Sequence, residues 1–392
     1  MKFLLPILFL FLSGSGDSVR SVDTSSLNTQ ITERRNSTLK WVANSLQKIS
    51  GDRSAYYPRM IQLRNGDVLI AYASSGNILL HRSVNNGSSW SEAQKIVQAE
   101  EGINMDTPDW LQLSNGKVLL FYGGRPEKAM SNNPQPGKQF DIRMISSHDN
   151  GESWSDPKIL FRAGIAKQNG CWEPSAVQLP SSQVQLFFAD ESPFSSSDDQ
   201  QISMLISNDG GVSFSKRPQL ISYRKGSRDG MPVPQYLSAT GEIVLAIEDL
   251  VKGNFKPYII RSSRLGTWTE PIHETSKYRE YALREKIDQQ IYAGAPYIRK
   301  ISDGRTLLSY QSTEYRSGNH HLNNARMVVR VGDQFAKEFS SPTYPFDVPE
   351  NRNALWSSIA ILKQDTIVAL TSTNAYSGRN AEIWMIKGVL NE

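Results

Sequence analysis

The chain has 392 residues, 39% of them hydrophobic, which is enough for one large domain or two ordinary ones. Its 43 basic and 39 acidic residues are interspersed and give a formal net charge of +4 without a basic run. This pattern argues against a nucleic-acid-binding protein. Cys171 is the single cysteine, so an internal disulfide framework is excluded.

Residues 1–16 have the three parts of a secretory signal peptide: Lys2, an apolar run from Phe3 to Leu12, and a short segment of Ser and Gly. The apolar run is too short to span a bilayer as a retained anchor. We therefore expect a secreted or periplasmic protein with no membrane attachment after cleavage. An uncleaved N-terminal anchor is the alternative. Residues 17–38 are polar, rich in Ser and Thr, and predicted to be a loose leader.

A unit made of an apolar strand, a tight turn and a second apolar strand occurs six times along the rest of the chain. The six copies are Tyr57–Ser74, Asp106–Arg125, Cys171–Ser192, Gly230–Asp249, Gly294–Ser312 and Leu355–Thr373. Their turn positions are Gly66, Gly116, Ser182, Gly241, Gly304 and Asp365. A proline stands eight or nine residues before five of these turns, and Ser357 takes its place in the sixth copy. Six units in register indicate a repeat architecture.

Each unit continues into a third strand, a further turn and a fourth strand. In the first three units this turn fits the pattern Ser-x-Asp-x-Gly-x-x-aromatic, called the Asp-box, with Asn85 in place of Asp in the first. The turns are Ser83–Trp90, Ser147–Trp154 and Ser207–Phe214. Asp or Asn can bond the backbone of such a turn, and Gly can take the positive φ it needs. The pattern indicates fold more than function, because its role is structural.

Four strands in each of six units predict a single all-β domain, a six-bladed β-propeller, over residues 39–392. Trp41–Ser50 shares a Gln-Lys-Ile sequence with the segment after Trp90, and we expect it to be the outer strand that closes the sixth blade. Tyr278–Gln290 is the one charged helical candidate, an insertion between the fourth and fifth blades. A β-sandwich would not need sixfold similarity, and a solenoid would need shorter, more uniform repeats.

In a propeller the first strand of each blade lines the axis, and its start lies beside the end of the antiparallel second strand. Residues at these two places therefore share one rim, opposite the Asp-box turns. This rim is rich in carboxylates and aromatic side chains, which together suit a sugar. Two glutamates are the candidate catalytic pair, Glu173 because Trp172 and Pro174 enclose it, and Glu248 because it interrupts an apolar strand.

The expected substrate-binding residues lie on the same rim, except Arg261, which follows Glu248 by thirteen residues. They are Tyr57, Arg59, Asp106, Asp109, Trp172, Asp190, Asp229, Arg261, Tyr297, Gln311 and Trp356. Taken singly, each carboxylate among them is more simply interpreted as a solvated residue of the rim or as the partner of an arginine. The five histidines show no metal-ligand spacing, so we expect neither a metal nor a cofactor. The expected partner is an oligosaccharide or polysaccharide, bound by a monomer.

These motifs resemble the sialidase-like Asp-box propellers, and the resemblance covers nearly the whole chain after the leader. Within that group the chain is most similar to glycoside hydrolase family 93, exo-acting α-1,5-L-arabinanases, through Tyr57-Pro58-Arg59 and Trp172-Glu173-Pro174. The resemblance implies a retaining hydrolase with catalytic glutamates at Glu173 and Glu248. We assign Glu173 as acid/base and Glu248 as nucleophile, with the reverse order left open.

Two other functions remain open. A sialidase is favoured by Arg59 and Arg261, which look like two of its three carboxylate-binding arginines. It is opposed by the missing loop that would carry its acidic Asp and by Trp356, which stands where its nucleophilic Tyr should be. A carbohydrate-binding propeller without catalytic activity is the third hypothesis.

Overall fold

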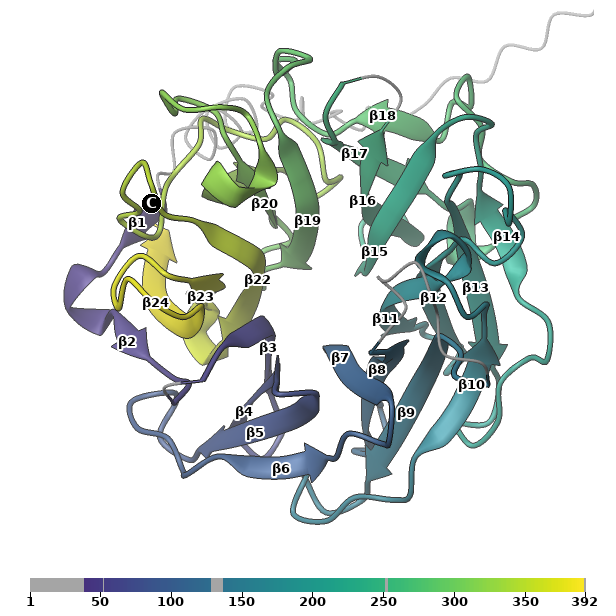
Figure 1. Ribbon diagram of the computed structural model, residues 1–392, viewed down its shortest axis with the longest axis horizontal. Helices are drawn as coiled ribbons and strands as arrows, with labels where there is room; N and C mark the ends of the chain where they lie inside the picture. The colour runs from purple at the N-terminus through teal and green to yellow at the C-terminus, as the bar shows by residue number, and fades with distance from the viewer. Residues whose placement is uncertain (1–38, 52, 128–136, 251–252, 391–392) are drawn as a thin grey trace, which may run out of the picture. The chain divides into compact units, whose positions relative to one another are not determined.

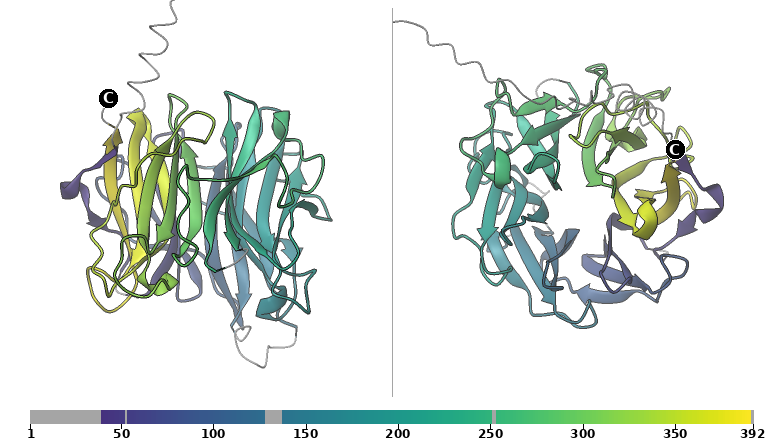
Figure 2. Two further views of the ribbon diagram at one scale, coloured as in Figure 1. Left: turned by 90° about the horizontal axis from the view of Figure 1, so that it is seen from above. Right: turned by 180° about the vertical axis from the view of Figure 1, so that it is seen from behind.

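The computed structural model describes residues 39–51, 53–127, 137–250 and 253–390, and these form a six-bladed β-propeller (Figure 1). The predicted fold is confirmed. The predicted signal peptide and leader lie outside the described residues. Each blade is an antiparallel sheet, and the first strand of each blade packs against the first strand of the next, from β3 around the ring to β22 and back. Figure 2 shows the ring from the side and from behind.

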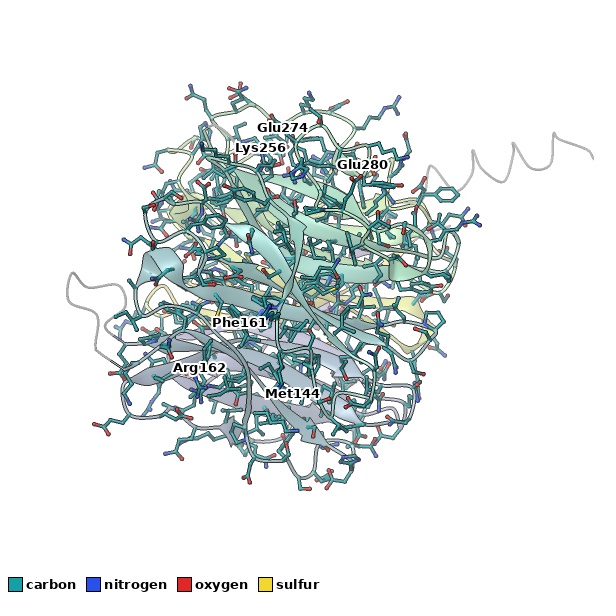
Figure 3. All side chains as sticks on the ribbon, turned by 90° about the vertical axis from the view of Figure 1, so that its right-hand side faces the viewer. Met144, Phe161, Arg162, Lys256, Glu274 and Glu280 are labelled. Carbon is teal, nitrogen blue, oxygen red and sulfur yellow. The ribbon has the colours of Figure 1, made fainter. Side chains whose placement is uncertain are left out.

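The first three blades each have four strands in chain order. Their strands are β3 (Ala55–Gln62), β4 (Val68–Ser74), β5 (Asn77–Ser83) and β6 (Gln94–Val97); β7 (Ile103–Gln112), β8 (Val118–Pro126), β9 (Asp141–Ser147) and β10 (Lys158–Arg162); and β11 (Cys171–Gln178), β12 (Val184–Asp190), β13 (Gln201–Ser207) and β14 (Gln219–Ser222). Met144, Phe161 and Arg162 of the second blade are labelled in Figure 3.

The other three blades follow the same order with two variations. Their strands are β15 (Arg228–Leu237), β16 (Glu242–Leu250), β17 (Lys256–Arg261) and β18 (Arg279–Tyr281); β19 (Ala293–Lys300), β20 (Thr306–Ser312) and β21 (Arg326–Gly332); and β22 (Ala354–Leu362), β23 (Thr366–Thr373) and β24 (Glu382–Leu390), with β1 (Leu39–Trp41) and β2 (Gln47–Lys48). Five short 3₁₀ turns complete the described elements: η1 (Ala43–Ser45), η2 (Lys167–Asn169), η3 (Arg264–Gly266), η4 (Leu322–Asn324) and η5 (Lys363–Asp365).

The fifth blade has three regular strands, and a single bridge between Val329 and Thr343 marks the place of its fourth. The helix predicted at Tyr278–Gln290 is wrong. This segment supplies β18, because Arg279, Glu280 and Tyr281 pair with β17 and complete the fourth blade. No helix among the described residues is long and apolar enough to cross a membrane.

The N-terminal segment closes the ring, as predicted. It does so as two short strands, β1 and β2, which both pair with β24 on either side of η1. Trp41 lies opposite Gly388, where a side chain on residue 388 would come within 2.8 Å of the indole ring. The Trp41 indole Nε1 also donates a hydrogen bond of 3.2 Å to Thr343 Oγ1. Trp41 therefore ties the sixth blade to the fifth.

The tight turns predicted between the first and second strands are confirmed, since all six turn positions adopt a positive φ, including Ser182 and Asp365. The turns between third and fourth strands lie on this same rim. In the second blade, Asp149 Oδ1 accepts from the Ser147 hydroxyl at 2.7 Å and from the Ser153 backbone N–H at 3.0 Å. Equivalent bonds occur at Asn85 and Asp209.

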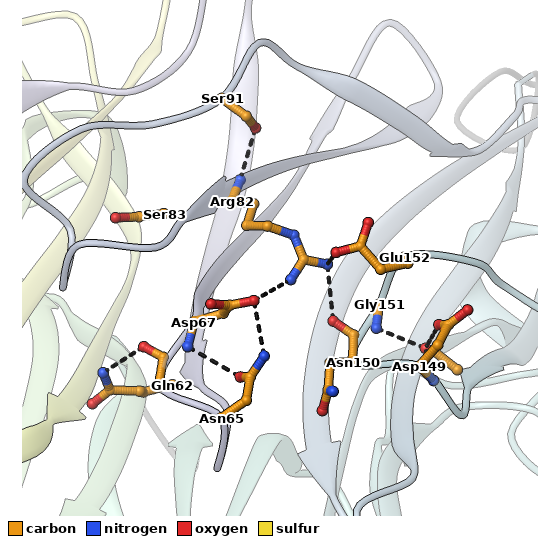
Figure 4. A network of polar contacts seen from close by, with 12 residues as sticks. Gln62, Asn65, Asp67, Arg82, Ser83, Ser91, Asp149, Asn150, Gly151 and Glu152 are labelled. Atoms are coloured by element: carbon orange, nitrogen blue, oxygen red, sulfur yellow. Dashed lines mark hydrogen bonds and ion pairs between the residues drawn. The ribbon is translucent and has the colours of Figure 1, made fainter.

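Neighbouring blades are tied together on this rim by polar contacts. Figure 4 shows Arg82 of the first blade, whose guanidinium contacts Asp67 at 2.5 Å and the backbone oxygen of Asn150 in the second blade at 2.9 Å. Glu152 lies 3.2 Å from the same guanidinium. These side chains are occupied in holding the ring together.

All six first strands carry a β-bulge at the same place, near the start of the strand. One residue in each bulge has a left-handed backbone: Tyr57, Thr107, Glu173, Met231, Ala295 and Trp356, with φ from 47° to 54°. The residue that follows is the proline of the repeat, or Ser357 in the sixth blade. Proline has no N–H to contribute to a ladder, so a bulge is one of the few places where a strand accepts it.

We predict that Trp41→Ala lowers the free energy of unfolding by about 2 kcal/mol, because it removes a partly buried ring that seals the closing strand. Val389→Ala is the matched control, since Val389 lies on the paired strand β24 but is 43% exposed. Chemical unfolding of both variants measures the difference. Equal stabilities would show that the closing strand contributes little.

Candidate active site

The six bulges turn side chains from several blades toward one another. Tyr57, Met231 and Ala295 form one buried cluster, and Tyr56 and Trp356 pack against it. The Trp356 ring lies 5.1 Å from that of Tyr57 and 5.6 Å from that of Tyr56. These residues come from the first, fourth, fifth and sixth blades, so the bulges of distant blades meet in one apolar and aromatic cluster.

Glu173 occupies the bulge of the third blade and lies beside Arg125, a partly buried arginine. Arg125 Nη2, from the end of β8, is 3.6 Å from Glu173 Oε1, and Arg125 Nη1 is 2.8 Å from Asp106 Oδ2. The Arg125 guanidinium also lies over the rings of Trp172 and Tyr57, at 4.8 Å and 5.5 Å. The structure thus brings four predicted site residues around an arginine that was not among the predicted set.

Burial raises the pKa of Glu173 to about 8. Arg125 opposes this shift, whereas the carboxylates of Glu248, Glu191 and Asp106 add to it. A glutamate in this environment holds its proton at neutral pH and can donate it to a bound molecule. The charge of Glu248 therefore acts on the pKa of Glu173, its predicted partner.

Glu248 lies near the end of β16, opposite Gly230 of β15, and its Oε2 accepts a hydrogen bond of 2.9 Å from the Ala295 backbone N–H. Two glycines make room for its carboxylate. A Cβ on Gly230 would lie 3.1 Å from Oε1, and one on Gly294 would lie 2.9 Å from Oε2. Burial raises the pKa of Glu248, while the Ala295 N–H and Arg228 act to lower it.

A tyrosine missed by the sequence analysis stands next to Glu248. Tyr292 precedes β19, and its hydroxyl accepts a hydrogen bond of 2.8 Å from Gln311 Nε2. Gln311 Oε1 in turn accepts from the Trp356 backbone N–H at 2.6 Å. Burial raises the pKa of Tyr292, and the charge of Glu248 raises it further. Gln311 and Trp356, both predicted, are thus linked to the candidate catalytic site through Tyr292.

Glu191, Gln200 and Arg228 form a second polar group beside the two glutamates, also missed as a unit. Arg228 Nη2 pairs with Glu191 Oε1, and Gln200 Nε2 donates to the same oxygen at 2.9 Å. Arg228 acts to lower the pKa of Glu248, and Glu191 acts to raise that of Glu173. The acidic pair Asp190-Glu191 at the end of a strand was the sequence signal for this group. The partner of Glu191 could not be found in the same way, because Arg228 begins the first strand of the next blade.

Three predicted substrate-binding residues form a buried cluster across the axis. Tyr297 Oη donates to Asp109 Oδ1 at 3.0 Å, joining the fifth blade to the second, and Ser175 of the third blade donates to Asp109 Oδ2. Arg59 packs over the Tyr297 ring at 4.8 Å and donates to the backbone oxygens of Pro58 and Trp356. These polar groups are paired with one another and hold the inner strands together.

Asp190 and Asp229 point into their own blades, where other side chains satisfy them. Asp190 is 1% exposed and accepts hydrogen bonds from Ser192 and Ser203. Asp229 is fully buried between Arg224 and Arg279. Although burial acts to raise it, the two arginines hold the pKa of Asp229 below its ordinary value. Asp229 thus has arginine partners, as in the alternative interpretation, whereas Asp190 is bound by serines and is not solvated.

Arg261 lies away from the two glutamates. It pairs with Val244 near the start of β16, whereas Glu248 lies near the end of that strand. Its guanidinium is bound to Glu280 and to the backbone oxygen of Ala336. No group of three or more His, Cys, Asp or Glu side chains in the described part of the chain is arranged to hold a metal ion.

Solved structures match this fold, although no protein-family model and no curated protein sequence matches the chain. A protein of unknown function from Dyadobacter fermentans matches at TM-score 0.68 with 16% identity, over 90% of this chain and 99% of that one. An α-L-arabinanase from Penicillium chrysogenum, solved with arabinobiose, matches at TM-score 0.64 with 17% identity over 91% and 98% of the two chains.

A family 93 α-L-arabinofuranosidase from Fusarium graminearum, also solved with arabinobiose, matches at TM-score 0.64 with 16% identity over 88% and 97%. Sialidases match as well, at TM-scores from 0.57 to 0.59. The chain therefore has the fold that these arabinan-cleaving enzymes and sialidases share, as the sequence resemblance implied.

We predict that Glu173→Gln becomes more stable relative to the unsubstituted protein as the pH rises from about 4.5 to about 8. The raised pKa of Glu173 means that its contribution to stability is fully present below about 4.5 and is lost as the carboxyl ionises near 8. Denaturant unfolding at pH 4, 6 and 9 measures the difference. Glu92→Gln, at an exposed position, controls for the loss of one charge. A difference that does not vary with pH would contradict the prediction.

Proposed function

We propose that this protein is a retaining glycoside hydrolase in which Glu173 is the acid/base and Glu248 the nucleophile. The observation that carries the proposal is the pair itself. Two partly buried carboxyl groups lie on one rim, where burial raises the pKa of both and the charge of Glu248 raises that of Glu173 further. Glu173 keeps its proton, whereas Glu248 receives a backbone N–H that stabilises its charged form.

The two roles follow from these environments. In the first step the Glu173 proton moves to the glycosidic oxygen as the bond to the leaving group breaks, and Glu248 bonds to the anomeric carbon. In the second step water attacks that carbon, Glu173 takes up a proton from the water, and Glu248 leaves as a carboxylate. Retention requires the two carboxyl groups to stand about 5 Å apart. The aromatic rings of Trp172, Tyr56 and Trp356 supply faces on which a sugar can stack.

For the substrate we propose α-1,5-L-arabinan or a related plant polysaccharide, cleaved from its end by an exported, monomeric enzyme. Support comes from the motifs Tyr57-Pro58-Arg59 and Trp172-Glu173-Pro174 and from the arabinobiose bound in two structures of the same fold. A sialidase is less favoured, because its arginines would have to bind the carboxylate of the substrate. Arg59 instead binds backbone oxygens, and Arg261 binds Glu280 on another part of the blade.

Product analysis tests the substrate. With linear α-1,5-arabinan we expect a short arabinose product, and NMR of the first product formed should show the same anomeric configuration as the substrate. Sialyl-lactose is the parallel substrate, from which we expect no release. Release of sialic acid would overturn the proposed substrate, and a product of inverted configuration would overturn the assignment of Glu248 as nucleophile.

Glutamate variants test the assignment of roles. We expect Glu173→Ala to lower kcat by about 10²- to 10⁴-fold on arabinan but much less on an aryl glycoside, whose leaving group needs no proton. We expect Glu248→Ala to lose turnover on both substrates, and azide to restore it with an inverted product. Glu242→Gln, at the other end of β16, is the matched control. Reversed behaviour of the two alanine variants would exchange the roles.

A further inference from the structure

We propose that Arg125 is a positioning residue that holds Glu173 as a carboxylate between the two chemical steps. It does so through Nη2, a guanidinium nitrogen that has no hydrogen-bond partner among the described residues. The role in the two steps rests on the proposed function, whereas the contact between Arg125 and Glu173 does not.

Three contacts hold the Arg125 guanidinium in place. Its Nη1 lies 2.8 Å from Asp106 Oδ2, and Asp106 is itself held, because its Oδ1 accepts a hydrogen bond of 2.7 Å from the Thr107 backbone N–H. The rings of Tyr57 and Trp172 lie 5.5 Å and 4.8 Å from the guanidinium carbon. An ion pair and two cation–π contacts leave such a side chain little freedom. Arg125 therefore offers its other nitrogens from a fixed position.

Two of these nitrogens, Nε and Nη2, are buried and lack a hydrogen-bond partner in the described part of the chain. Buried donors are rarely left unpaired, so each such case calls for an explanation. Glu173 Oε1 lies 3.6 Å from Nη2, which is too long for a hydrogen bond. A movement of the Glu173 carboxyl by about 1 Å would bring the two atoms to the distance of a charge-assisted hydrogen bond. Nη2 is thus a donor placed for Glu173.

The charges around Glu173 change during the proposed reaction. Before the first step, burial and the carboxylates of Glu248, Glu191 and Asp106 raise the pKa of Glu173 to about 8, and Arg125 opposes this only in part. The glutamate therefore keeps its proton at neutral pH. When Glu248 bonds to the anomeric carbon it loses its charge, so one of the groups that raise the pKa of Glu173 is gone. The balance then moves towards Arg125, which favours the carboxylate.

The remaining neighbours of Glu173 do not replace Arg125 in this role. Arg228, which begins β15, is paired with Glu191. Burial raises the pKa of Tyr57 and of Tyr292, and the charge of Glu173 adds to both shifts, so both phenols stay neutral. Arg125 is therefore the cation whose contact with Glu173 can stabilise its ionised form.

The movement of protons defines when Arg125 acts. In the first step the proton of Glu173 passes to the glycosidic oxygen, and the electron pair stays on the Glu173 carboxylate. Nη2 of Arg125 then binds this carboxylate and orients it. In the second step the water oxygen bonds to the anomeric carbon, Glu248 leaves, and a water proton moves to Glu173. A base that is already oriented accepts this proton more readily than one that is free to turn.

Substitutions on the two sides of Arg125 test the contact without a substrate. In protein labelled with ¹³C at glutamate carboxyl carbons, with Glu173→Gln used for assignment, we expect Arg125→Met to raise the pKa of Glu173 from about 8 to about 9 or above. Asp106→Asn should lower this pKa, because a repelling carboxylate is removed. Arg125→Lys keeps the charge but loses the planar guanidinium, so it should raise the pKa less than Arg125→Met does.

Arg82→Met is the matched control. Arg82 is also a partly buried arginine paired with an aspartate, but it lies on the opposite rim, so its loss should leave the Glu173 titration unchanged. A general disturbance of the fold would shift the titration in the same direction in every variant. An unchanged pKa of Glu173 in folded Arg125→Met and Arg125→Lys proteins would refute the inference, even in an enzyme that cleaves arabinan.

Kinetics on an aryl glycoside test the role in the second step. The first step on this substrate needs no proton, so we expect Arg125→Met to lower kcat about tenfold near pH 7 with little change in kcat/KM, while the covalent intermediate accumulates. The loss should diminish as the pH rises towards the raised pKa, because Glu173 then ionises without help. Azide needs no base, so it should restore kcat and give a product of retained configuration.

A fall in kcat/KM on the aryl glycoside without accumulation of the intermediate would rule out the role in the second step. If the titration shifts as expected in a protein that cleaves no glycoside, the contact between Arg125 and Glu173 stands, whereas the proposed function and the role in its second step both fail.

Discussion

The left-handed bulge in each first strand is the constraint on which the site depends. A left-handed non-glycine residue costs about 1–3 kcal/mol, so six of them in register require strong support from the surrounding strands. Each bulge frees a backbone N–H from the ladder, and three of these bind side chains: Thr107 to Asp106, Ala295 to Glu248 and Trp356 to Gln311. The distortion that accommodates a proline in five of the six first strands also supplies donors at the axis.

Neighbouring cations determine which carboxylates on this rim have a raised pKa and which a lowered one. Asp229 and Glu248 belong to adjacent strands of one blade, yet Asp229 lies between two arginines, which hold its pKa low, while burial raises that of Glu248. Glu173 differs again, because the arginine beside it is shared with Asp106 and only partly offsets burial. Position along the strand brings a carboxylate to the rim, but its cationic neighbours determine its protonation state.

This difference explains how far the sequence could go. Turn glycines and bulge prolines are local features that repeat, so the blades and the ring closure were predictable. Glu173 could be proposed from the sequence because its neighbours Trp172 and Pro174 are apolar. The position of Tyr292 was not predictable, since it precedes its strand and its neighbours Gln311 and Glu248 belong to two different blades. The helix predicted at Tyr278–Gln290 failed for a similar reason: pairing with β17 overrides the local preference of a charged segment.

Hydrogen bonds lead from Trp356 of the sixth blade through Gln311 to Tyr292 of the fifth blade, whose hydroxyl borders the same glycine as Glu248 of the fourth. Its first member lies on β22, in the same sheet as β24, which β1 and β2 cover. The position of β22 relative to β20 therefore depends on how firmly the ring is closed. Trp41 contributes to this closure through its contacts with Gly388 and Thr343. The closing strands at the outer edge therefore help to fix the hydrogen bonds near the axis. Side chains from six blades keep their positions relative to one another only while the ring stays closed.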